Sequence, residues 1–459
     1  MKSLVPLLFA ALGLSLLSGK TQTTNVIYIL ADDLGWGEVG FNGQKMIDTP
    51  ELDELAAQGM RFTAHYSGNA VCAPARCSLM TGRHPGKAYI RANSPGFPNG
   101  QTPIPADSET VAKLFKRAGY HTALIGKWGL GGYLPGNVQS TGYPNKQGFD
   151  YFFGYLDQRH AHNYYTDHLF RNADKIPLDG KTYSHDLKTQ EALQYIREQK
   201  DGPFYLYLAY NIPHTKYQVP DLAQYADKEW PEDMKIHAAM TSRMDRDIGT
   251  IIDLLHELKI AENTLVIFNS DNGAHGQKKS EAFFDTSGPL RDIKRSMYEG
   301  GLRTPMVAYW PGTIKPGSTS DHISAFWDML PTFSELTGEP IHGETDGISM
   351  LPTLIGEPEQ QKKHKYLYWE LYERKPNAAI RMGNWKAVVP DRRQPEKIEL
   401  YDLSQDESES NDLSSQHPEI VDKLKKLMAE AHEPSPFWKV KPEGKRFFRA
   451  SLAKEANGL

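Results

Sequence analysis

The sequence predicts an α/β fold in which a mainly parallel central sheet is sandwiched by helices, followed by a smaller C-terminal α+β subdomain with an antiparallel sheet. Two observations lead to this prediction. Short apolar runs alternate with segments of helical periodicity over most of the chain, which is typical of a parallel sheet covered by helices. From about His364 onward, several strand-like runs follow one another directly, which favours an antiparallel sheet. A chain of 459 residues is long enough for a large unit and a smaller one.

Four apolar runs are expected to form the centre of the large sheet. They cover residues 25–30, 122–126, 204–209 and 265–269. The first is continuous rather than alternating, as expected for a strand that is buried on both faces. Apolar residues at helical spacing predict helices at residues 52–59, 111–118 and 236–258. This order of elements predicts parallel strands joined through helices.

The C-terminal subdomain is expected to hold four short strands and one covering helix. The strands are predicted at residues 366–369, 378–381, 385–389 and 399–401, and the helix at 420–431 with Pro418 near its start. The polar, turn-rich stretch 352–363 precedes them, so we place the boundary there. The predicted organisation is a signal peptide at 1–20, a large α/β domain at 21–360, a C-terminal subdomain at 361–435 and a tail at 436–459.

The N-terminus has the features of a secretory signal peptide. A lysine follows the first methionine, an apolar block runs from Leu4 to Leu17, and small residues follow it. A membrane anchor is the competing interpretation, but the apolar run is shorter than the roughly 20 residues that a span needs. We therefore expect a secreted or periplasmic protein with no membrane span after signal removal. The net charge of −5 is mild and spread out, which excludes an electrostatic footprint for nucleic acid.

Polar residues stand where the predicted core strands end. These are Asp32-Asp33, Lys127, His214 and Asp271-Asn272. In open α/β sheets, ligands bind beyond the carboxyl ends of the strands. Adjacent carboxylates repel each other at such an edge unless a cation offsets their charge, and a set of oxygen ligands suits a hard ion such as Ca²⁺. The alternative is that Asp33 caps a helix and residues 271–273 form only a turn.

The segment Cys72-Ala73-Pro74-Ala75-Arg76 resembles the sulfatase signature Cys-x-Pro-x-Arg. Taken alone, it could equally be a proline-containing turn with two buried cysteines, Cys72 and Cys77. Further segments resemble type I sulfatase blocks in the right order: Thr49-Pro50-Glu51-Leu52-Asp53, Gly126-Lys127-Trp128, Ser242-Arg243-Met244-Asp245, Ser270-Asp271-Asn272-Gly273, Tyr298-Glu299-Gly300-Gly301 and Leu400-Tyr401-Asp402-Leu403. The chain is therefore identified as a member of the formylglycine-dependent sulfatases of the alkaline-phosphatase-like fold.

This resemblance implies a sulfuric ester hydrolase that needs one modified residue and one metal ion. The modification is oxidation of Cys72 to formylglycine by a maturation enzyme; the hydrated aldehyde is the nucleophile. The metal ion is Ca²⁺, with ligands implied to be Asp32, Asp33, Cys72, Asp271 and Asn272. The resemblance also implies that Arg76 and Lys127 hold the hydrate, and that His214 and Lys294 contact the sulfate and its leaving group.

These residue types suit sulfate ester cleavage for reasons that hold without the resemblance. Negative charge moves onto the leaving oxygen while an anionic group is attacked, so fixed cations and a metal ion lower the barrier. Arg76, Lys127 and Lys294 can supply such charges at any working pH. An imidazole at His214 can donate a proton to an alkoxide leaving group near neutral pH.

One position departs from the common pattern of the family. Many relatives have Gly-Lys-Trp-His where this chain has Gly126-Lys127-Trp128-Gly129, so the histidine that accepts a proton during sulfate release is absent there. His275 is our first expectation for a residue that takes its place.

The substrate class is expected to be a sulfated small molecule or glycan. The segment 158–165 is dense in polar and aromatic residues, and its His160 and His162 are expected to contact substrate together with His275. The alternative is a loop whose aromatics pack locally. The tail from 437 to 459 carries six Lys or Arg against two Glu, interleaved with aromatics that are expected to dock on the body.

Two other function classes stay open at this point. One is a phosphoester hydrolase of the same superfamily, since phosphate and sulfate share tetrahedral geometry. The other is a non-catalytic protein that binds sulfated glycans, in which Cys72 stays a thiol.

Overall fold

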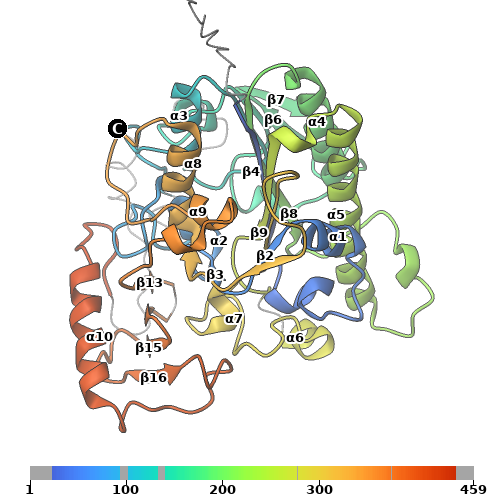
Figure 1. The fold of residues 1–459 in the computed structure, drawn as a ribbon. Helices are drawn as coiled ribbons and strands as arrows, with labels where there is room; N and C mark the ends of the chain where they lie inside the picture. The colour runs from blue at the N-terminus through green and yellow to red at the C-terminus, as the bar shows by residue number, and fades with distance from the viewer. Residues whose placement is uncertain (1–22, 94–101, 133–139, 276–277, 374, 441–459) are drawn as a thin grey trace, which may run out of the picture.

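A computed structural model describes residues 23–93, 102–132, 140–275, 278–373 and 375–440. The expected signal peptide and all but residues 436–440 of the tail lie outside these ranges. A ten-stranded sheet runs through the large unit in the order β11-β2-β10-β9-β1-β8-β4-β5-β6-β7. Helices cover both of its faces (Figure 1), which confirms the predicted α/β architecture.

Five neighbouring strands at the centre of the sheet are parallel. They are β9 (Thr264–Ser270), β1 (Asn25–Asp32), β8 (Phe204–Pro213), β4 (His121–Lys127) and β5 (Tyr151–Tyr155). Four of these are the strands predicted from the apolar runs. Within the ten-stranded sheet, antiparallel pairing lies toward the two edges. There β10 (Met306–Tyr309) pairs with β9 and β2 (Met60–Phe62), and β6 (His168–Arg171) pairs with β5 and β7 (Asp174–Pro177). Strand β11 (Ser318–Ser320) runs parallel to β2.

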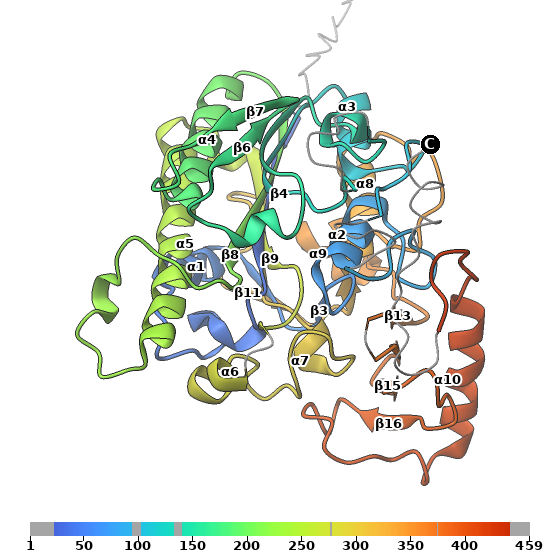
Figure 2. The same ribbon diagram turned by 180° about the vertical axis from the view of Figure 1, so that it is seen from behind.

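The two faces of the sheet pack against different groups of helices (Figures 1 and 2). One face is covered by α1 (Pro50–Gln58), α4 (Ser184–Gln199) and α5 (Glu232–Glu257), and the other by α2 (Cys72–Thr81), α3 (Val111–Arg117), α8 (Met329–Thr337) and α9 (Leu351–Leu354). Alternate side chains of β1 serve the two cores: Ile27 and Ile29 face the first group, and Tyr28 faces the second. The continuous apolar run of β1 is therefore a consequence of burial on both sides.

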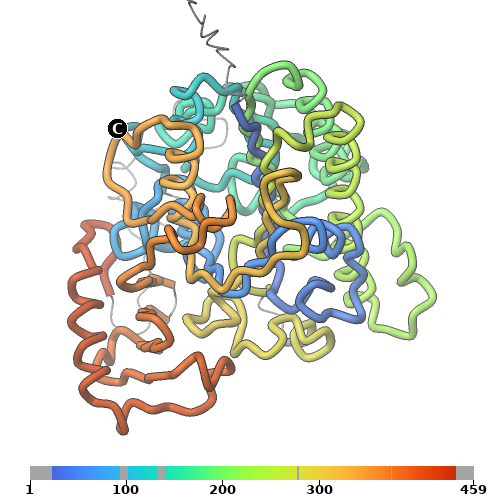
Figure 3. The backbone as a smooth tube through the Cα atoms, viewed as in Figure 1, coloured from blue at the N-terminus to red at the C-terminus, as the bar shows by residue number. Residues whose placement is uncertain are grey.

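The C-terminal part forms a separate antiparallel sheet, as predicted. Its strands are β13 (Leu367–Leu371), β14 (Asn377–Met382), β15 (Trp385–Val389) and β16 (Glu399–Asp402), in that order, and α10 (Pro418–Ala431) lies along it (Figure 3). Leu424 and Leu427 of α10 pack on one face of this sheet. On the other face, Trp369 packs against Tyr66 and Trp327 of the large unit.

The remaining named elements are short. They are β3 (His65–Tyr66), β12 (Ser324–Ala325), α6 (Lys278–Phe284) and α7 (Glu299–Leu302). Beyond α10, Trp438 donates its indole N–H to the Tyr89 carbonyl at 2.7 Å, so this aromatic residue docks on the body as expected. Within the described residues, no helix combines the length and the apolar character that crossing a membrane requires.

Candidate active site

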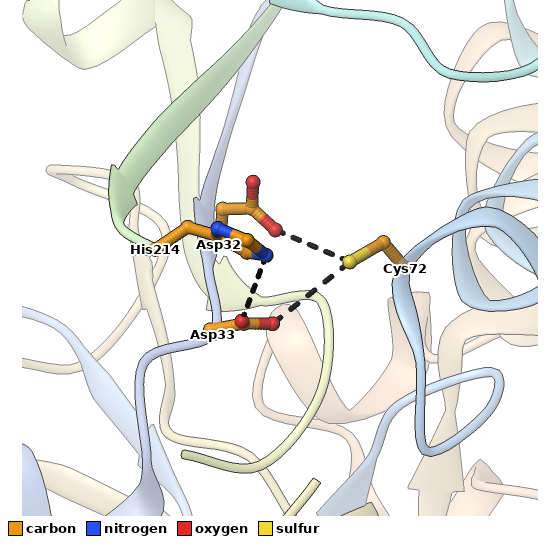
Figure 4. A group of neighbouring side chains, drawn as sticks. All are labelled: Asp32, Asp33, Cys72 and His214. Atoms are coloured by element: carbon orange, nitrogen blue, oxygen red, sulfur yellow. Dashed lines mark hydrogen bonds and ion pairs between the residues drawn. The ribbon is translucent and has the colours of Figure 1, made fainter. Parts of the chain in front are cut away.

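Two adjacent aspartates at the end of β1 form the base of a buried polar cluster. In a strand, neighbouring side chains point to opposite faces of the sheet. Asp33 has a φ of 67°, in the left-handed region, so the backbone turns directly after Asp32. Both carboxylates consequently lie near the thiol of Cys72: Sγ is 3.4 Å from Asp32 Oδ1 and 3.8 Å from Asp33 Oδ1 (Figure 4). All three side chains are buried.

Cys72 and Arg76 reach this centre from one face of α2. Cys72 is the first residue of the helix, and Arg76 follows one turn later on the same side. Pro74 lies within the first turn, where its missing N–H removes no helical hydrogen bond. The segment is therefore a helix start rather than only a turn, and Cys77 lies on the same helix directly after Arg76. The spacing in Cys-x-Pro-x-Arg serves to bring a thiol and a guanidinium together.

Each of three buried carboxylates is paired with a buried cation. Lys127 Nζ lies 2.6 Å from Asp32 Oδ2, and Lys294 Nζ lies 2.5 Å and 2.7 Å from the two oxygens of Asp33. Arg76 donates to Asp271 Oδ2 through Nε at 3.0 Å and Nη2 at 2.8 Å. The three negative and three positive charges cancel, which makes their joint burial possible.

Burial and the neighbouring charges together set the pKa values of these carboxyls and of the Cys72 thiol. Burial alone would raise the pKa of Asp33, but Lys294 outweighs it and holds that pKa well below its usual range. Burial and repulsion from Asp32 act to raise the pKa of Asp271, and the bidentate contact with Arg76 opposes that rise and favours the carboxylate. Burial also raises the pKa of the Cys72 thiol, so the unmodified side chain is a neutral thiol and a poor nucleophile at neutral pH.

The cluster also has the oxygen donors that a hard cation requires. Carboxylates of Asp32, Asp33 and Asp271 converge there, and Asn272 Nδ2 donates to Asp33 Oδ1 at 2.7 Å. The amide oxygen of Asn272 is buried without a hydrogen-bond partner in the described part of the chain. A buried amide oxygen without a donor is costly, and a cation would satisfy it. These residues therefore fit a Ca²⁺ ion.

Three histidine side chains meet at this centre. His214 Nε2 lies 3.2 Å from Asp33 Oδ2 (Figure 4), and burial holds the pKa of its imidazole below the usual range. The ring of His162 stacks on that of His214, with centroids 4.0 Å apart. The ring of His275 approaches His214 edge-on at 5.3 Å, and its Nε2 lies 3.1 Å from Thr215 Oγ1. His162 and His275 therefore lie beside the cluster, and their contact with substrate stays a prediction.

His160 makes its contacts with other residues than His162 does. Its Nε2 lies 2.7 Å from Thr166 Oγ1, and its ring stacks on His168 at 4.2 Å. His160 and His162 belong to one turn of 3₁₀ helix (His160–His162). Because such a helix has three residues per turn, residues two apart point in different directions. The structure thus brings only His162 to the polar cluster.

A hydrogen-bond network holds the His162 turn against the end of β8. Asn211 Nδ2 donates to the Ala161 carbonyl at 2.5 Å, and the Tyr164 hydroxyl lies 2.5 Å from the Asn211 carbonyl and 2.6 Å from that of His214. The buried ammonium of Lys188 on α4 donates to Asn211 Oδ1, and burial lowers the pKa of Lys188 to about 7. Sequence reasoning missed Lys188, because one lysine on an amphipathic helix carries no signal of burial.

Gly129 lies two residues after Lys127, the last residue of β4. Its φ of 74° is left-handed, and a side chain there would meet Gln158, whose Nε2 lies 2.3 Å from an ideal Cβ position. The missing side chain is thus matched by a glutamine that fills the same space.

This fold and this cluster define a hydrolase of the alkaline-phosphatase-like superfamily. The sulfatase family model matches residues 24–339, and the model for the C-terminal region of N-sulphoglucosamine sulphohydrolase matches residues 291–434. The chain belongs to the sulfatase family and is a sulfuric ester hydrolase.

Curated relatives and solved structures agree with this assignment. The chain is 32% identical over 412 residues to N-acetylgalactosamine-6-sulfatase of Mus musculus, covering 83% of this chain and 74% of the relative. It is 30% identical over 466 residues to arylsulfatase A of Homo sapiens, covering 88% and 86%. The structure of Ps i-CgsB in complex with k-i-k-neocarrahexaose superposes with a TM-score of 0.77 at 30% identity, covering 92% of this chain and 95% of that one.

Proposed function

We propose that this chain is an exported sulfatase that hydrolyses a sulfate ester on a sulfated carbohydrate. One observation carries the proposal. At the carboxyl edge of the sheet, the buried Cys72 thiol lies next to Asp32 and Asp33, in a cluster that also contains the cationic side chains of Arg76, Lys127 and Lys294. The names of relatives support the substrate class: one curated relative is a sulfatase of an amino sugar, and one similar structure is a complex with a neocarrahexaose.

The proposal includes formylglycine at position 72 and a bound Ca²⁺ ion. Formylglycine, when formed by a maturation enzyme, supplies a hydrated aldehyde oxygen as nucleophile, and Ca²⁺ supplies positive charge beside the sulfate oxygens. Asp32, Asp33, Asp271 and Asn272 would hold the ion together with the modified residue 72. Because the surrounding side chains are already neutral as a set, the ion would leave the centre net positive and suited to an anionic ester.

The cationic side chains bind and orient the reacting groups in this proposal. Arg76 donates its Nη1 to the Lys127 carbonyl at 2.8 Å, which fixes both residues next to position 72. Lys294 Nζ lies 3.5 Å from Cys72 Sγ, so it can contact the nucleophile and a sulfate oxygen at once. Fixed charges aimed at developing negative charge lower the barrier without reorganisation.

His214 would donate a proton to the departing sugar oxygen. Its pKa lies below the usual range in the free site because of burial. An anionic ester beside the ring favours the imidazolium form, so substrate binding itself would prepare the acid. The Tyr164 hydroxyl, which contacts the His214 carbonyl, and the stacked ring of His162 would hold the imidazole in place.

One experiment tests whether modification of Cys72 gives the chain sulfatase activity. The chain is produced with and without a formylglycine-generating enzyme, its intact mass is measured, and both forms are assayed against a panel of sulfated monosaccharides in the presence of Ca²⁺. The modified form alone is expected to release sulfate. Modification without turnover on any sulfate ester would favour a glycan-binding protein, whereas turnover of phosphate esters with two bound zinc ions would favour a phosphoester hydrolase.

A further inference from the structure

The side chain of Gln158 lies over the Cα of Gly129, where glycine has no side chain to block it. Gly129 follows β4, and its left-handed φ of 74° is one that side-chain-bearing residues rarely adopt. The Gln158 amide lies over its Cα, with Nε2, Cδ and Cγ at 2.3, 3.0 and 3.4 Å from the ideal Cβ position. Glycine at 129 and glutamine at 158 are therefore spatially complementary: a side chain at 129 would displace the amide.

The amide of Gln158 is buried and lacks a partner. The residue is 8% exposed, and its Nε2 has no hydrogen-bond partner in the described part of the chain. Buried polar atoms are paired in the great majority of cases, because an unmet donor loses its bonds to water without replacement. A bound ligand with an acceptor oxygen would satisfy this donor.

The position of Gln158 is fixed by the loop that follows β5. The Asp157 carboxylate accepts from the Arg159 and His160 backbone N–H groups at 2.8 and 3.0 Å, which closes the turn around Gln158. The Gly129 N–H donates to the Leu156 carbonyl at 3.2 Å, which ties this loop to the end of β4. The amide is thereby held at the same sheet edge as Lys127.

The same loop carries His162 into the polar cluster. The neighbours that act electrostatically on its imidazole include Lys127, Asp32 and Lys294, so His162 lies within reach of the buried charges. Gln158 lies over Gly129, two residues after Lys127, and His162 stacks on His214, so this loop places two side chains beside the cluster. A substrate anion placed among the cations would meet this loop.

We propose that Gln158 is a sulfate-binding residue whose Nε2, held over Gly129, donates a hydrogen bond to an oxygen of the bound sulfate group. The inference rests on the proposed function and names how this chain compensates for Gly129. A neutral amide suits the role, because the cluster already holds three cations and needs directional donors rather than further charge.

The test uses inorganic sulfate as the probe, on the full chain in its unmodified state with Ca²⁺ present. Isothermal titration calorimetry gives the Kd of sodium sulfate for the parent chain and for Gln158→Met, which has similar length but no donor. The expected result is a Kd that is roughly ten- to hundredfold weaker in the variant. Without sulfate, the Tm of Gln158→Met should be equal to or above that of the parent, because an unmet buried donor has been removed.

A matched variant separates this role from ordinary packing. Gln147 is also buried, but its Nε2 donates to the carbonyls of Pro105 at 2.9 Å and Thr141 at 2.8 Å. Gln147→Met should lower the Tm and leave the sulfate Kd unchanged. Gln158→Glu, which replaces the donor by an anion of the same shape, should weaken sulfate binding at least as much as Gln158→Met.

Two results would overturn the inference. One is an unchanged sulfate Kd in Gln158→Met, and the other is an absence of sulfate binding to the parent chain itself. If the modified parent hydrolyses sulfate esters while Gln158→Met binds sulfate normally, the inference fails and the proposed function stands. If the modified parent hydrolyses none, the proposed function fails and the sulfate Kd still decides the role of Gln158.

Discussion

The imidazole rings of His162 and His214 lie nearly parallel, with centroids 4.0 Å apart and an interplanar angle of 19°. His214 also reaches the Asp33 carboxylate at 3.2 Å, whereas the ring of His162 forms no hydrogen bond with the described residues. One imidazole of the pair is thus tied to the aspartates, and the other remains available to a substrate. We therefore expect the two imidazoles to have different roles in catalysis, and the kinetics of single variants can distinguish these roles.

His214→Ala should depend strongly on the leaving group. A sugar alkoxide is a poor leaving group and needs a proton, whereas an activated aryl oxide does not. We expect kcat on a sulfated sugar to fall by roughly 10²- to 10⁴-fold, and kcat on an activated aryl sulfate to fall far less. Steady-state kinetics on both substrates with the modified protein provides the measurement. Equal losses on the two would contradict the general-acid role.

Cys72→Ala and Cys72→Ser should both abolish turnover without unfolding the protein. Alanine has no nucleophilic side chain, and an unoxidised serine has no second hydroxyl with which to expel sulfate. The fold does not depend on the thiol, whose neighbours are paired with one another. Sulfate release and thermal melting of the same samples check this prediction. Cys77→Ser is the control, since Cys77 is a small buried residue on α2 and should affect activity little. Near-normal kcat in Cys72→Ala would refute the mechanism.

Removal of the metal should destabilise the parent protein but not Asp33→Asn. Binding of an ion to the folded state alone stabilises it by about 2.7 kcal/mol when the free ion is at 100 times its Kd. We expect Ca²⁺ to raise the Tm of the parent and EGTA to reverse the rise. Asp33→Asn also leaves Lys294 without its buried carboxylate, so its own Tm should be lower and insensitive to Ca²⁺.

A surface carboxylate provides the comparison for this experiment. Asp179 is exposed and accepts backbone N–H groups of Lys181 and Thr182, so Asp179→Asn should keep the full response to Ca²⁺. Metal analysis that found two zinc ions per chain would instead support a phosphoester hydrolase. If EGTA changed neither the activity nor the Tm of the parent protein, the metal ion would have no part in the mechanism.

Much of this architecture could be predicted because the signals are local in the sequence. The apolar run of β1 and the aspartates directly after it lie in one segment, and the spacing of Cys72 and Arg76 fits one helical turn. Parallel strands bring their carboxyl ends to one edge of the sheet. That Lys127 and His214 lie near the aspartates therefore follows from the fold class.

The rest depends on contacts between distant segments. The fit of Gln158 over Gly129 arises only when the end of β4 meets the loop after β5, and the burial of Lys188 only when α4 packs on β8. The directions of His160 and His162 depend on a single 3₁₀ turn, which the sequence pattern did not indicate. Side-chain direction at such places is decided by tertiary packing rather than by periodicity.

Glu370 should make stability depend on acid pH. Its buried carboxylate on β13 lies 2.7 Å from Arg91 and 3.1 Å from Arg392, and it accepts from His432 at 2.8 Å. Burial alone would raise the pKa of Glu370, but His432, Arg392 and Arg91 outweigh it and lower that pKa to about 2. Because the folded pKa is below the unfolded value, the stabilisation is complete above about pH 4.5 and is lost as the pH falls toward 2.

The comparison variant for this prediction is Glu370→Gln, which lacks the titrating group. At neutral pH it should be less stable by roughly 3–5 kcal/mol, the usual cost of breaking a buried ion pair. Chemical denaturation at several pH values should show this difference shrinking steadily below about pH 4.5. A difference that stays constant between pH 7 and pH 3 would mean that the charge of Glu370 contributes nothing.

The last prediction concerns which histidine serves as proton acceptor in the absence of one at Gly129. His275 was the expectation from sequence, but its Nε2 lies 3.1 Å from Thr215 Oγ1, whereas the ring of His162 stacks on His214 and forms no hydrogen bond with the described residues. We therefore expect His162→Ala to lower kcat by about 10²-fold and His275→Ala to have a smaller effect. Since this proton transfer follows departure of the alcohol, the loss in His162→Ala should be similar for sugar and aryl sulfates, unlike that in His214→Ala. A leaving-group dependence in His162→Ala that matched His214→Ala would show that His162 only supports its stacked neighbour, and a larger loss in His275→Ala would return the role to that residue.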